Sequence, residues 1–179
     1  MNGCDKTMSS NVENLVIKSK QGDTVAFGEL YELYSKDLFR FAVYYTGSQA
    51  VAEDCVSEAV LIAFKKIGEL KNISSFKSWL FRILRNSCTA EFRKKSREIL
   101  SEEMYSGVHS FDEASNEKVS LRRALMKLNE DERELVILYY CIGYTSKEIG
   151  LMLTMNENTV RSKISRATDK LKKELKDGE

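Results

Sequence analysis

The alternation of hydrophobic and polar positions has a helical period along almost the whole chain. Apolar residues recur every three or four positions from about Asn11 to Arg97, and again from Lys118 to about Leu175. In residues 24–46 they form one stripe that is expected to face inward: Leu30, Leu33, Tyr34, Leu38, Phe41 and Ala42. No proline interrupts either stretch, because the chain contains none. The pattern predicts an all-α protein.

Capping residues indicate where the helices of the first stretch begin and end. Asp23 is a favourable N-cap for a long helix that stops at Thr46-Gly47-Ser48. Ser48 is expected to start the next helix, which runs to about Ile67, and Ser75 to cap the one after it. These signals predict a polar loop, GELKNIS, between the last two helices.

An acidic segment, residues 98–117, separates the two helical stretches. It contains six Asp or Glu residues and no Lys or Arg, together with four Ser and one Gly. Such a composition, with little apolar periodicity, is typical of a flexible linker. We therefore expect two small helical domains with separate cores, 11–97 and 118–179, preceded by a disordered tail over 1–10.

The second domain ends in the pattern of a helix-turn-helix. Thr145-x-x-Glu148 is a capping box, and Asn156 is a good N-cap for a helix after a tight turn. In that helix the apolar positions fall on one stripe: Val160, Ile164, Ala167 and Leu171. The other positions expected to face or flank DNA are Asn158, Arg161, Ser162, Lys163, Ser165 and Arg166. Residues 159–176 hold seven basic residues and two acids, so the helix is expected to enter a major groove.

Two surfaces of the first domain carry further candidate chemistry. One face of the helix that starts at Ser48 gathers acids around two large apolar side chains: Glu53, Asp54, Ser57, Glu58, Leu61 and Phe64. Such a face would suit a basic partner helix. The next helix interleaves aromatic with basic and polar side chains, a pattern that can hold single-stranded DNA: Trp79, Arg82, Arg85, Asn86, Arg93 and Lys94.

Other functional classes find little support in the sequence. No glycine-rich phosphate loop or nucleophile with a neighbouring histidine is visible, so we do not expect an enzyme or a bound cofactor. The cysteines, at positions 4, 55, 88 and 141, are scattered and are expected to be free thiols, three of them buried. No apolar stretch is long enough to span a bilayer, and the expected location is the cytoplasm.

The order of these motifs resembles a known family. The segments GDTVAFGELYELY, AEDCVSEAV and SFKSWLFRILRNSCTAEFRKK resemble region two of the extracytoplasmic-function sigma factors of bacterial RNA polymerase. The segment from Leu125 to Leu175 resembles region four of sigma factors, and also the DNA-binding domain of LuxR-type regulators. The expected function is therefore to direct RNA polymerase core to promoters and to assist promoter melting.

The resemblance implies roles for both domains. The helix capped by Asn156 would read the −35 element, through the exposed residues named above. The acidic face would bind the clamp helices of the largest polymerase subunit, although Ser57 stands where the family commonly has Gln. The loop would capture a base flipped from the −10 element, with the residues Leu70, Lys71, Asn72, Ile73 and Ser74. The segment 138–140, expected to be mostly core, would lie near a concavity for the flap of the second-largest subunit. An anti-sigma factor is a further possible partner.

Two other functions remain open from the sequence. A stand-alone LuxR-type regulator would use only the helix-turn-helix, with a sensing or dimerising domain in front. A helical interaction protein would bind no DNA at all. A sigma factor differs from both in needing core polymerase for promoter-dependent transcription.

Overall fold

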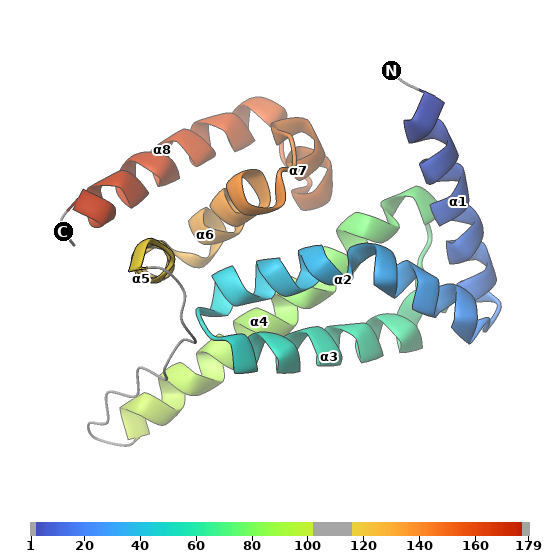
Figure 1. The fold of residues 1–179 in the computed structure, drawn as a ribbon, viewed down its shortest axis with the longest axis horizontal. Coiled ribbons are helices and arrows are strands. Elements are labelled where there is room, and N and C mark those ends of the chain that lie inside the picture. The colour runs from blue at the N-terminus through green and yellow to red at the C-terminus, as the bar shows by residue number, and fades with distance from the viewer. Residues whose placement is uncertain (1–2, 102–115, 177–179) are drawn as a thin grey trace.

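The computed structural model describes the backbone of residues 3–101 and 116–176, and the side chains of residues 11–91 and 121–175. Within these ranges every regular element is a helix (Figure 1). The N-terminal domain consists of α1 (Gly3–Lys20), α2 (Thr24–Thr46), α3 (Gln49–Lys66), the short 3-10 turns η1 (Ile67–Glu69) and η2 (Ile73–Ser75), and α4 (Phe76–Ser101). The C-terminal domain consists of α5 (Asn116–Lys127), α6 (Glu130–Val136), the π-helix η3 (Ile137–Ile142), α7 (Ser146–Leu153) and α8 (Glu157–Lys176).

The helix ends of the N-terminal domain lie close to where the caps predict them. Asp23 accepts hydrogen bonds from the N–H groups of Val25 and Ala26, and Gly47 ends α2 with a left-handed φ of 74°. Ser48 caps α3 through its side chain. The start of α4 differs: Ser75 donates to the carbonyl of Asn72 instead of accepting an N–H from the helix. The cap side chain lies three residues earlier, at Asn72, which accepts the N–H of Ser74 and caps η2, the 3-10 turn that leads into α4.

The two chain ends of the N-terminal domain also extend further than expected. Helix α1 begins at Gly3, where the sequence predicts a disordered tail, and α4 continues to Ser101. The segment predicted as an acidic linker lies mostly outside the described residues, since only its ends, 98–101 and 116–117, are described, both as helix. The linker therefore stays a prediction.

The core of the N-terminal domain forms where α2 packs between α1, α3 and α4. Phe41 stacks on Tyr45 with ring centroids 5.4 Å apart and meets the edge of Phe81 at 5.8 Å. The stripe predicted on α2 is buried at Leu30, Leu38, Phe41 and Ala42. The prediction is wrong for Leu33, which is 48% exposed because it lies at the edge of that stripe.

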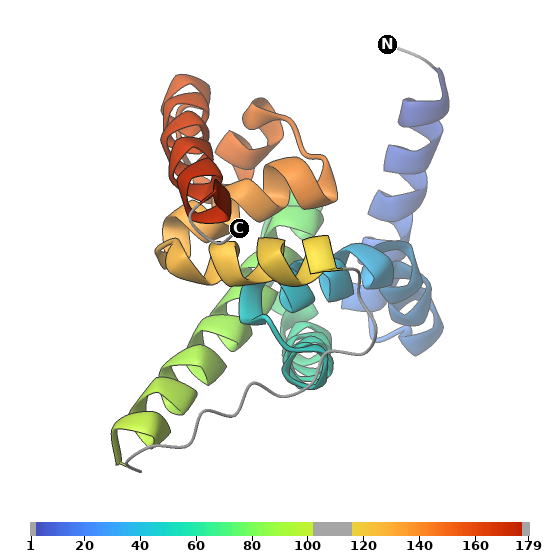
Figure 2. The same ribbon diagram turned by 60° about the vertical axis from the view of Figure 1, so that its left-hand side comes forward.

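The two domains are in contact. Helix α2 contacts both η3 and α5, and α4 contacts α7, so the C-terminal domain lies against one side of the N-terminal domain (Figures 1 and 2). The buried apolar residues of both domains form one continuous cluster. This differs from the expectation of two separate cores, because the sequence pattern does not show which inward faces will meet.

Candidate nucleic-acid and polymerase-binding surfaces

The helix-turn-helix is built from close backbone packing at the turn between α7 and α8. Thr145 and Glu148 form the predicted capping box at the start of α7. A methyl group added to Gly150 would lie 2.7 Å from the carbonyl oxygen of Met155, so only glycine fits where the two helices cross. Thr154 takes a left-handed φ of 56°, and Asn156 accepts the N–H of Asn158 at 2.9 Å to begin α8.

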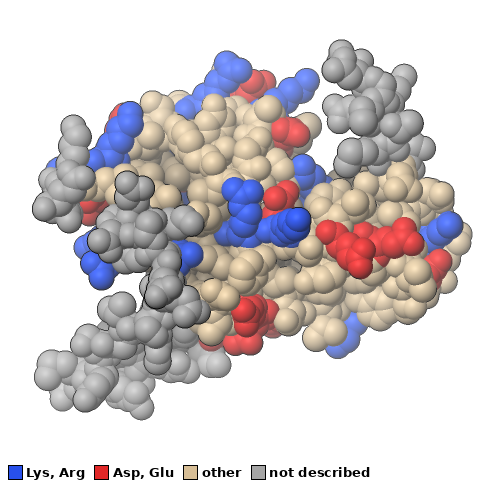
Figure 3. Space-filling model, in the orientation of Figure 1, with Lys and Arg blue, Asp and Glu red and all other residues tan. Residues whose placement is uncertain are grey.

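Helix α8 has one buried and one exposed face, as its pattern predicts. Val160, Ile164, Ala167 and Leu171 are buried against the rest of the C-terminal domain. The exposed face consists of Asn158, Arg161, Ser162, Ser165 and Arg166, while Lys163 is half-buried. Figure 3 shows basic side chains along the edge of the molecule formed by α8. The structure thus brings the six expected duplex-contacting residues onto one helix, five of them open to solvent.

Local contacts order part of this exposed face. The guanidinium of Arg161 pairs with the Glu157 carboxylate at 2.6 Å, one turn earlier. Arg166 donates from Nε to the Ser162 carbonyl at 3.3 Å. Both arginines therefore lie along the helix surface, where their remaining N–H donors are available to bases or phosphates.

A cleft lies beside α8, next to the segment 138–140 for which the resemblance implies a concavity. It has a volume of about 800 Å³, and its walls come from η3, the start of α7 and α8. Tyr139 and Tyr140 line it and are 38% and 58% exposed. Their prediction as core is wrong, because a π-helix adds a residue to the turn and moves its side chains out of the α-helical phase. Leu138, expected to be core, is buried.

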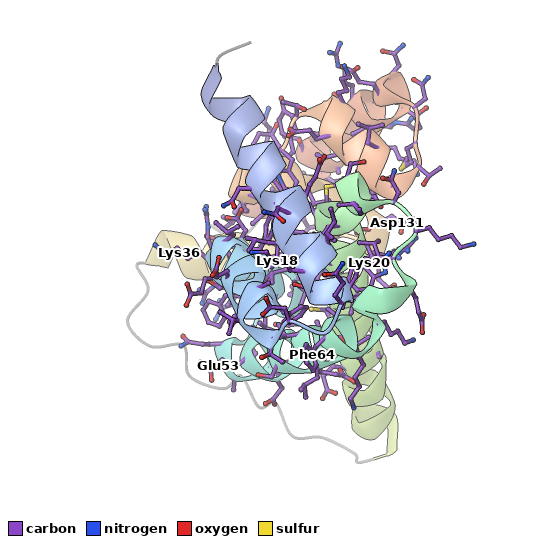
Figure 4. The ribbon with its side chains drawn as sticks, turned by 90° about the vertical axis from the view of Figure 1, so that its right-hand side faces the viewer. Lys18, Lys20, Lys36, Glu53, Phe64 and Asp131 are labelled. Carbon is purple, nitrogen blue, oxygen red and sulfur yellow. The ribbon has the colours of Figure 1, made fainter. Side chains whose placement is uncertain are left out.

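The loop before α4 is held by contacts from two sides. The Asn72 side chain accepts hydrogen bonds from the N–H and hydroxyl groups of Ser74, at 3.1 and 2.8 Å. Lys20, at the end of α1, donates to the Leu70 carbonyl at 2.5 Å. Figure 4 labels Lys20 on this helix. Lys20 lies outside the sequence motifs, so no sequence signal pointed to it.

The residues expected to hold the −10 strand fall into several groups. Lys71, Asn72 and Ser74 are exposed on the loop, and Arg82 and Asn86 are exposed one helical turn apart on α4. Ile73 and Trp79 are half-buried. The structure does not bring Leu70 to this surface, because its side chain is 5% exposed and belongs to the core. The side chains of Arg93 and Lys94 lie outside the described residues.

Arg85 turns away from the exposed face of α4, toward the C-terminal domain. Its Nη2 lies 2.9 Å from Oδ1 of Asp131, and its Nε lies 3.2 Å from Oε2 of Glu134 without hydrogen-bond alignment. Burial raises the pKa of Glu134 to about 7, although Arg85 acts to lower it. Arg85 is therefore separated from Arg82 and Asn86 in this arrangement.

The acidic face of α3 is exposed as predicted. Glu53, Asp54, Ser57 and Glu58 are all exposed. Leu61 is 59% and Phe64 42% exposed, although the rings of Phe64 and Phe27 pack edge to face with centroids 5.1 Å apart. Figure 4 labels Phe64 and Glu53 on this side of the molecule. A hollow of about 330 Å³ lies beside Glu53 and Ser57, between α3 and α2. Large apolar side chains held open among carboxylates suit a docking surface.

The described residues offer no cluster of His, Cys, Asp or Glu that could hold a metal ion. Cys55 and Cys88 are buried and Cys141 is half-buried. Among the helices that the structure describes, none is both long and apolar enough to cross a membrane.

Comparisons with known proteins agree with this architecture. Residues 30–98 match the family model Sigma-70 region 2, and residues 118–171 match Sigma-70, region 4. The chain is 31% identical to the ECF RNA polymerase sigma factor BldN of Streptomyces coelicolor, over 94% of this chain and 67% of the relative. The chain belongs to the ECF sigma factors. It is also 27% identical to SigW of Bacillus subtilis, over 95% of this chain and all of the relative.

Solved structures share the fold. The sigma factor RpoE of Bartonella quintana, solved with the anti-sigma factor NepR, is 28% identical, with a TM-score of 0.67 over 84% of this chain and 96% of that one. CnrH, solved with the cytosolic domain of CnrY, is 23% identical, with a TM-score of 0.72 over 94% and 99%. The match of residues 30–98 to region 2 does not favour the alternative of a stand-alone LuxR-type regulator.

Proposed function

We propose that this sigma factor recognises the −35 element through α8 while its N-terminal domain binds polymerase and the −10 element. The observation that carries the proposal is the exposed face of α8, on which Asn158, Arg161, Ser162, Ser165 and Arg166 stand opposite a fully buried stripe. Arg can bond guanine edges or phosphates, Asn can bond adenine, and Ser allows close approach. In a helix-turn-helix this is the face that enters the major groove.

The N-terminal domain supplies the contacts to opened DNA and to polymerase. The loop residues Lys71, Asn72 and Ser74 form a site for a flipped −10 base, and Arg82 and Asn86 steady the strand beside it. The acidic face of α3 binds the clamp helices of the largest subunit, and the C-terminal domain contacts the flap of the second-largest. The phosphodiester chemistry belongs to the polymerase core, in the cytoplasm.

An anti-sigma factor is a further proposed partner. The RpoE relative was solved with its anti-sigma factor NepR, and it covers both domains of this chain at 28% identity. Such a partner would compete with polymerase for one or more of the surfaces described above.

Transcription in vitro tests the assignment of α8. The full chain with core polymerase is expected to start transcription from a host promoter and to lose most of that activity when the −35 sequence is scrambled. The double variant Arg161→Ala with Arg166→Ala should transcribe the intact and the scrambled promoter almost equally, so that the ratio of the two transcript yields is close to one. Lys18→Ala with Arg123→Ala, which removes two exposed charges from α1 and α5, is the charge-matched control. An unchanged ratio in the double variant would refute the role of α8, and no promoter-dependent transcript at all would refute the proposal as a whole.

A further inference from the structure

Two cysteines of the N-terminal domain meet where α3 packs on α4. Cys55 of α3 is 2% exposed and Cys88 of α4 is 0% exposed, and both belong to the same apolar cluster. Helices α3 and α4 are in contact (Figure 1), and the two thiols lie within hydrogen-bonding reach of each other. The buried side chains of α3 are mostly small, which lets neighbouring helices approach it closely: Ala52, Cys55, Val56, Ala59 and Ala63.

Neighbouring contacts hold both helices at this point. Directly after Cys88, the Thr89 hydroxyl is hydrogen-bonded to the hydroxyl of Tyr45 at 2.9 Å, which ties α4 to the end of α2. Two turns before Cys55, the side chain of Ser48 caps α3. Two thiols held in contact by packed helices are an arrangement from which a disulfide can form.

The hydrogen bond between the thiols makes them chemically different. It lowers the pKa of Cys55 below the usual value for a thiol. Burial and three nearby carboxylates oppose this effect: Glu91, Glu58 and Asp54. The same hydrogen bond raises the pKa of Cys88, and burial raises it further. Because the thiolate is the reactive form of cysteine, Cys55 is the sulfur that reacts first, while Cys88 keeps its proton.

We propose that Cys55 and Cys88 are a thiol–disulfide pair that hydrogen peroxide oxidises, and that the resulting bond clamps α3 to α4. The Cys55 thiolate attacks one peroxide oxygen, the O–O bond breaks, and the proton released by Cys55 converts the leaving hydroxide to water. This step leaves a sulfenic acid on Cys55. The Cys88 sulfur then attacks the Cys55 sulfur, the S–O bond breaks, and the hydroxide leaves as water with the Cys88 proton. The two sulfurs are oxidised, and the peroxide is reduced to two waters.

Burial determines which reagents reach the pair. Hydrogen peroxide reaches Cys55 when the helices part locally, whereas a bulky thiol reagent needs a larger opening and should react more slowly. Once Cys55 is oxidised, Cys88 is already beside it and should resolve the sulfenic acid before further oxidation. Cys141 of the C-terminal domain is half-buried, and burial raises its pKa to about 11, so it competes poorly for oxidant.

The bond would close a loop of chain that contains the −10 loop. Residues 56–87 lie between the two cysteines, and they include Lys71, Asn72 and Ser74. A disulfide that ties the helices on both sides of this segment should stabilise the folded N-terminal domain and should restrict opening of the loop. The bearing of the bond on DNA binding rests on the proposed function, whereas the formation of the bond does not.

Peroxide treatment of the full chain tests the pair. In a chain with Cys4→Ser and Cys141→Ser, the only cysteines left are Cys55 and Cys88. The treated protein should lose two hydrogen atoms from its intact mass, gain no oxygen, and leave no thiol to alkylate after unfolding. Dithiothreitol should reverse these changes. The matched control adds Cys88→Ala and should not lose the two hydrogen atoms.

Thermal unfolding and hydrogen–deuterium exchange measure the clamp. The oxidised chain should melt roughly 5–10 °C above the reduced chain, because the bond constrains the unfolded state. Residues 67–75 should also exchange their amide hydrogens more slowly after oxidation. In the Cys88→Ala control, peroxide treatment should change neither the Tm nor the exchange of this segment.

Each result either supports or overturns the pair. Thiols that stay free, oxygen that stays on Cys55, or disulfides formed only between chains would overturn it. A bond between Cys55 and Cys88 that changes neither Tm nor loop exchange would overturn the clamp. If the Cys88→Ala chain does not fold, a digest of the non-reduced monomer decides, because the bond then has to appear as a linked pair of peptides. None of these measurements uses promoter DNA or polymerase, so their failure leaves the proposed function standing.

Discussion

Arg133 offers the sharpest test of how the C-terminal domain is held together. Its side chain is only 2% exposed, and it donates to the carbonyls of Leu125, Met126 and Leu128 at the end of α5, and of Tyr45 at the end of α2. Helix ends leave their last carbonyls without partners in the helix, and the one guanidinium satisfies several of them. Burial lowers the pKa of Arg133.

Replacing Arg133 with Met keeps much of the volume and leaves these acceptors without their donor. Each unsatisfied buried acceptor costs about 1–3 kcal/mol, partly offset because a guanidinium no longer has to be buried. We expect a loss of about 3 kcal/mol of unfolding free energy, which for a chain of this size corresponds to a fall in Tm of roughly 6–12 °C. Arg133→Lys, with fewer donors on a flexible stem, should fall between the Arg133→Met variant and wild type.

The assay is thermal unfolding followed by circular dichroism. Arg123→Met, which removes an exposed arginine from the same region of α5, should change Tm by no more than about a degree or two, since exposed substitutions have small effects. An Arg133→Met chain that melts within about 2 °C of wild type, or one no less stable than the Arg123→Met variant, would refute the reasoning.

Three further predictions follow from single contacts. Gly150→Ala should destabilise the helix-turn-helix by about 2 kcal/mol in urea unfolding, because the new methyl group overlaps a carbonyl. The control, Gly28→Ala, places its methyl group in open space within α2 and should stabilise the chain by up to about 1 kcal/mol. A similar effect of both variants would contradict the packing at the turn. Lys20→Met should speed hydrogen–deuterium exchange in residues 69–75, because the loop loses its donor to the Leu70 carbonyl, and unchanged exchange would show that the loop orders itself. Because its pKa is raised from 4.5 to about 7 in the folded chain, Glu134 should make stability fall as pH rises from 4.5 to 7, and Glu134→Gln should flatten that part of the urea-midpoint profile; an equal slope in the variant would show that other groups cause it.

The sequence was sufficient wherever structure depends on residues close together in the chain. Asp23, Ser48 and Thr145 cap helices because each cap lies within three residues of the N–H groups it accepts. The buried stripe of α8 and the exposed acids of α3 follow from helical period alone. The exposed faces that we propose for major-groove binding and for docking could therefore be located without coordinates.

Interactions between distant residues were not visible in the sequence. Arg85 belongs by sequence to a row of basic residues on α4, yet its partner Asp131 lies 46 positions away. Leu70 sits in a polar loop and is nevertheless part of the core. The residue type shows which interactions an arginine such as Arg85 can make. The packing of whole helices determines whether it contacts nucleic acid or forms an ion pair within the protein.

The π-helix η3 has a practical consequence for mutagenesis of this chain. Tyr139 and Tyr140 lie within η3 and are exposed at the surface. Tyr144 lies two residues after the end of η3, directly after Gly143 with its φ of 88°, and is buried. Inserting or deleting one residue there would rotate the following residues by about 100° relative to the preceding ones. Such a change would displace the exposed pair Tyr139 and Tyr140 relative to the buried Tyr144. The effect of a substitution in this segment should accordingly be measured both at the exposed cleft and at the buried contact of Tyr144, since a loss of function at one of them can be caused by a change at the other.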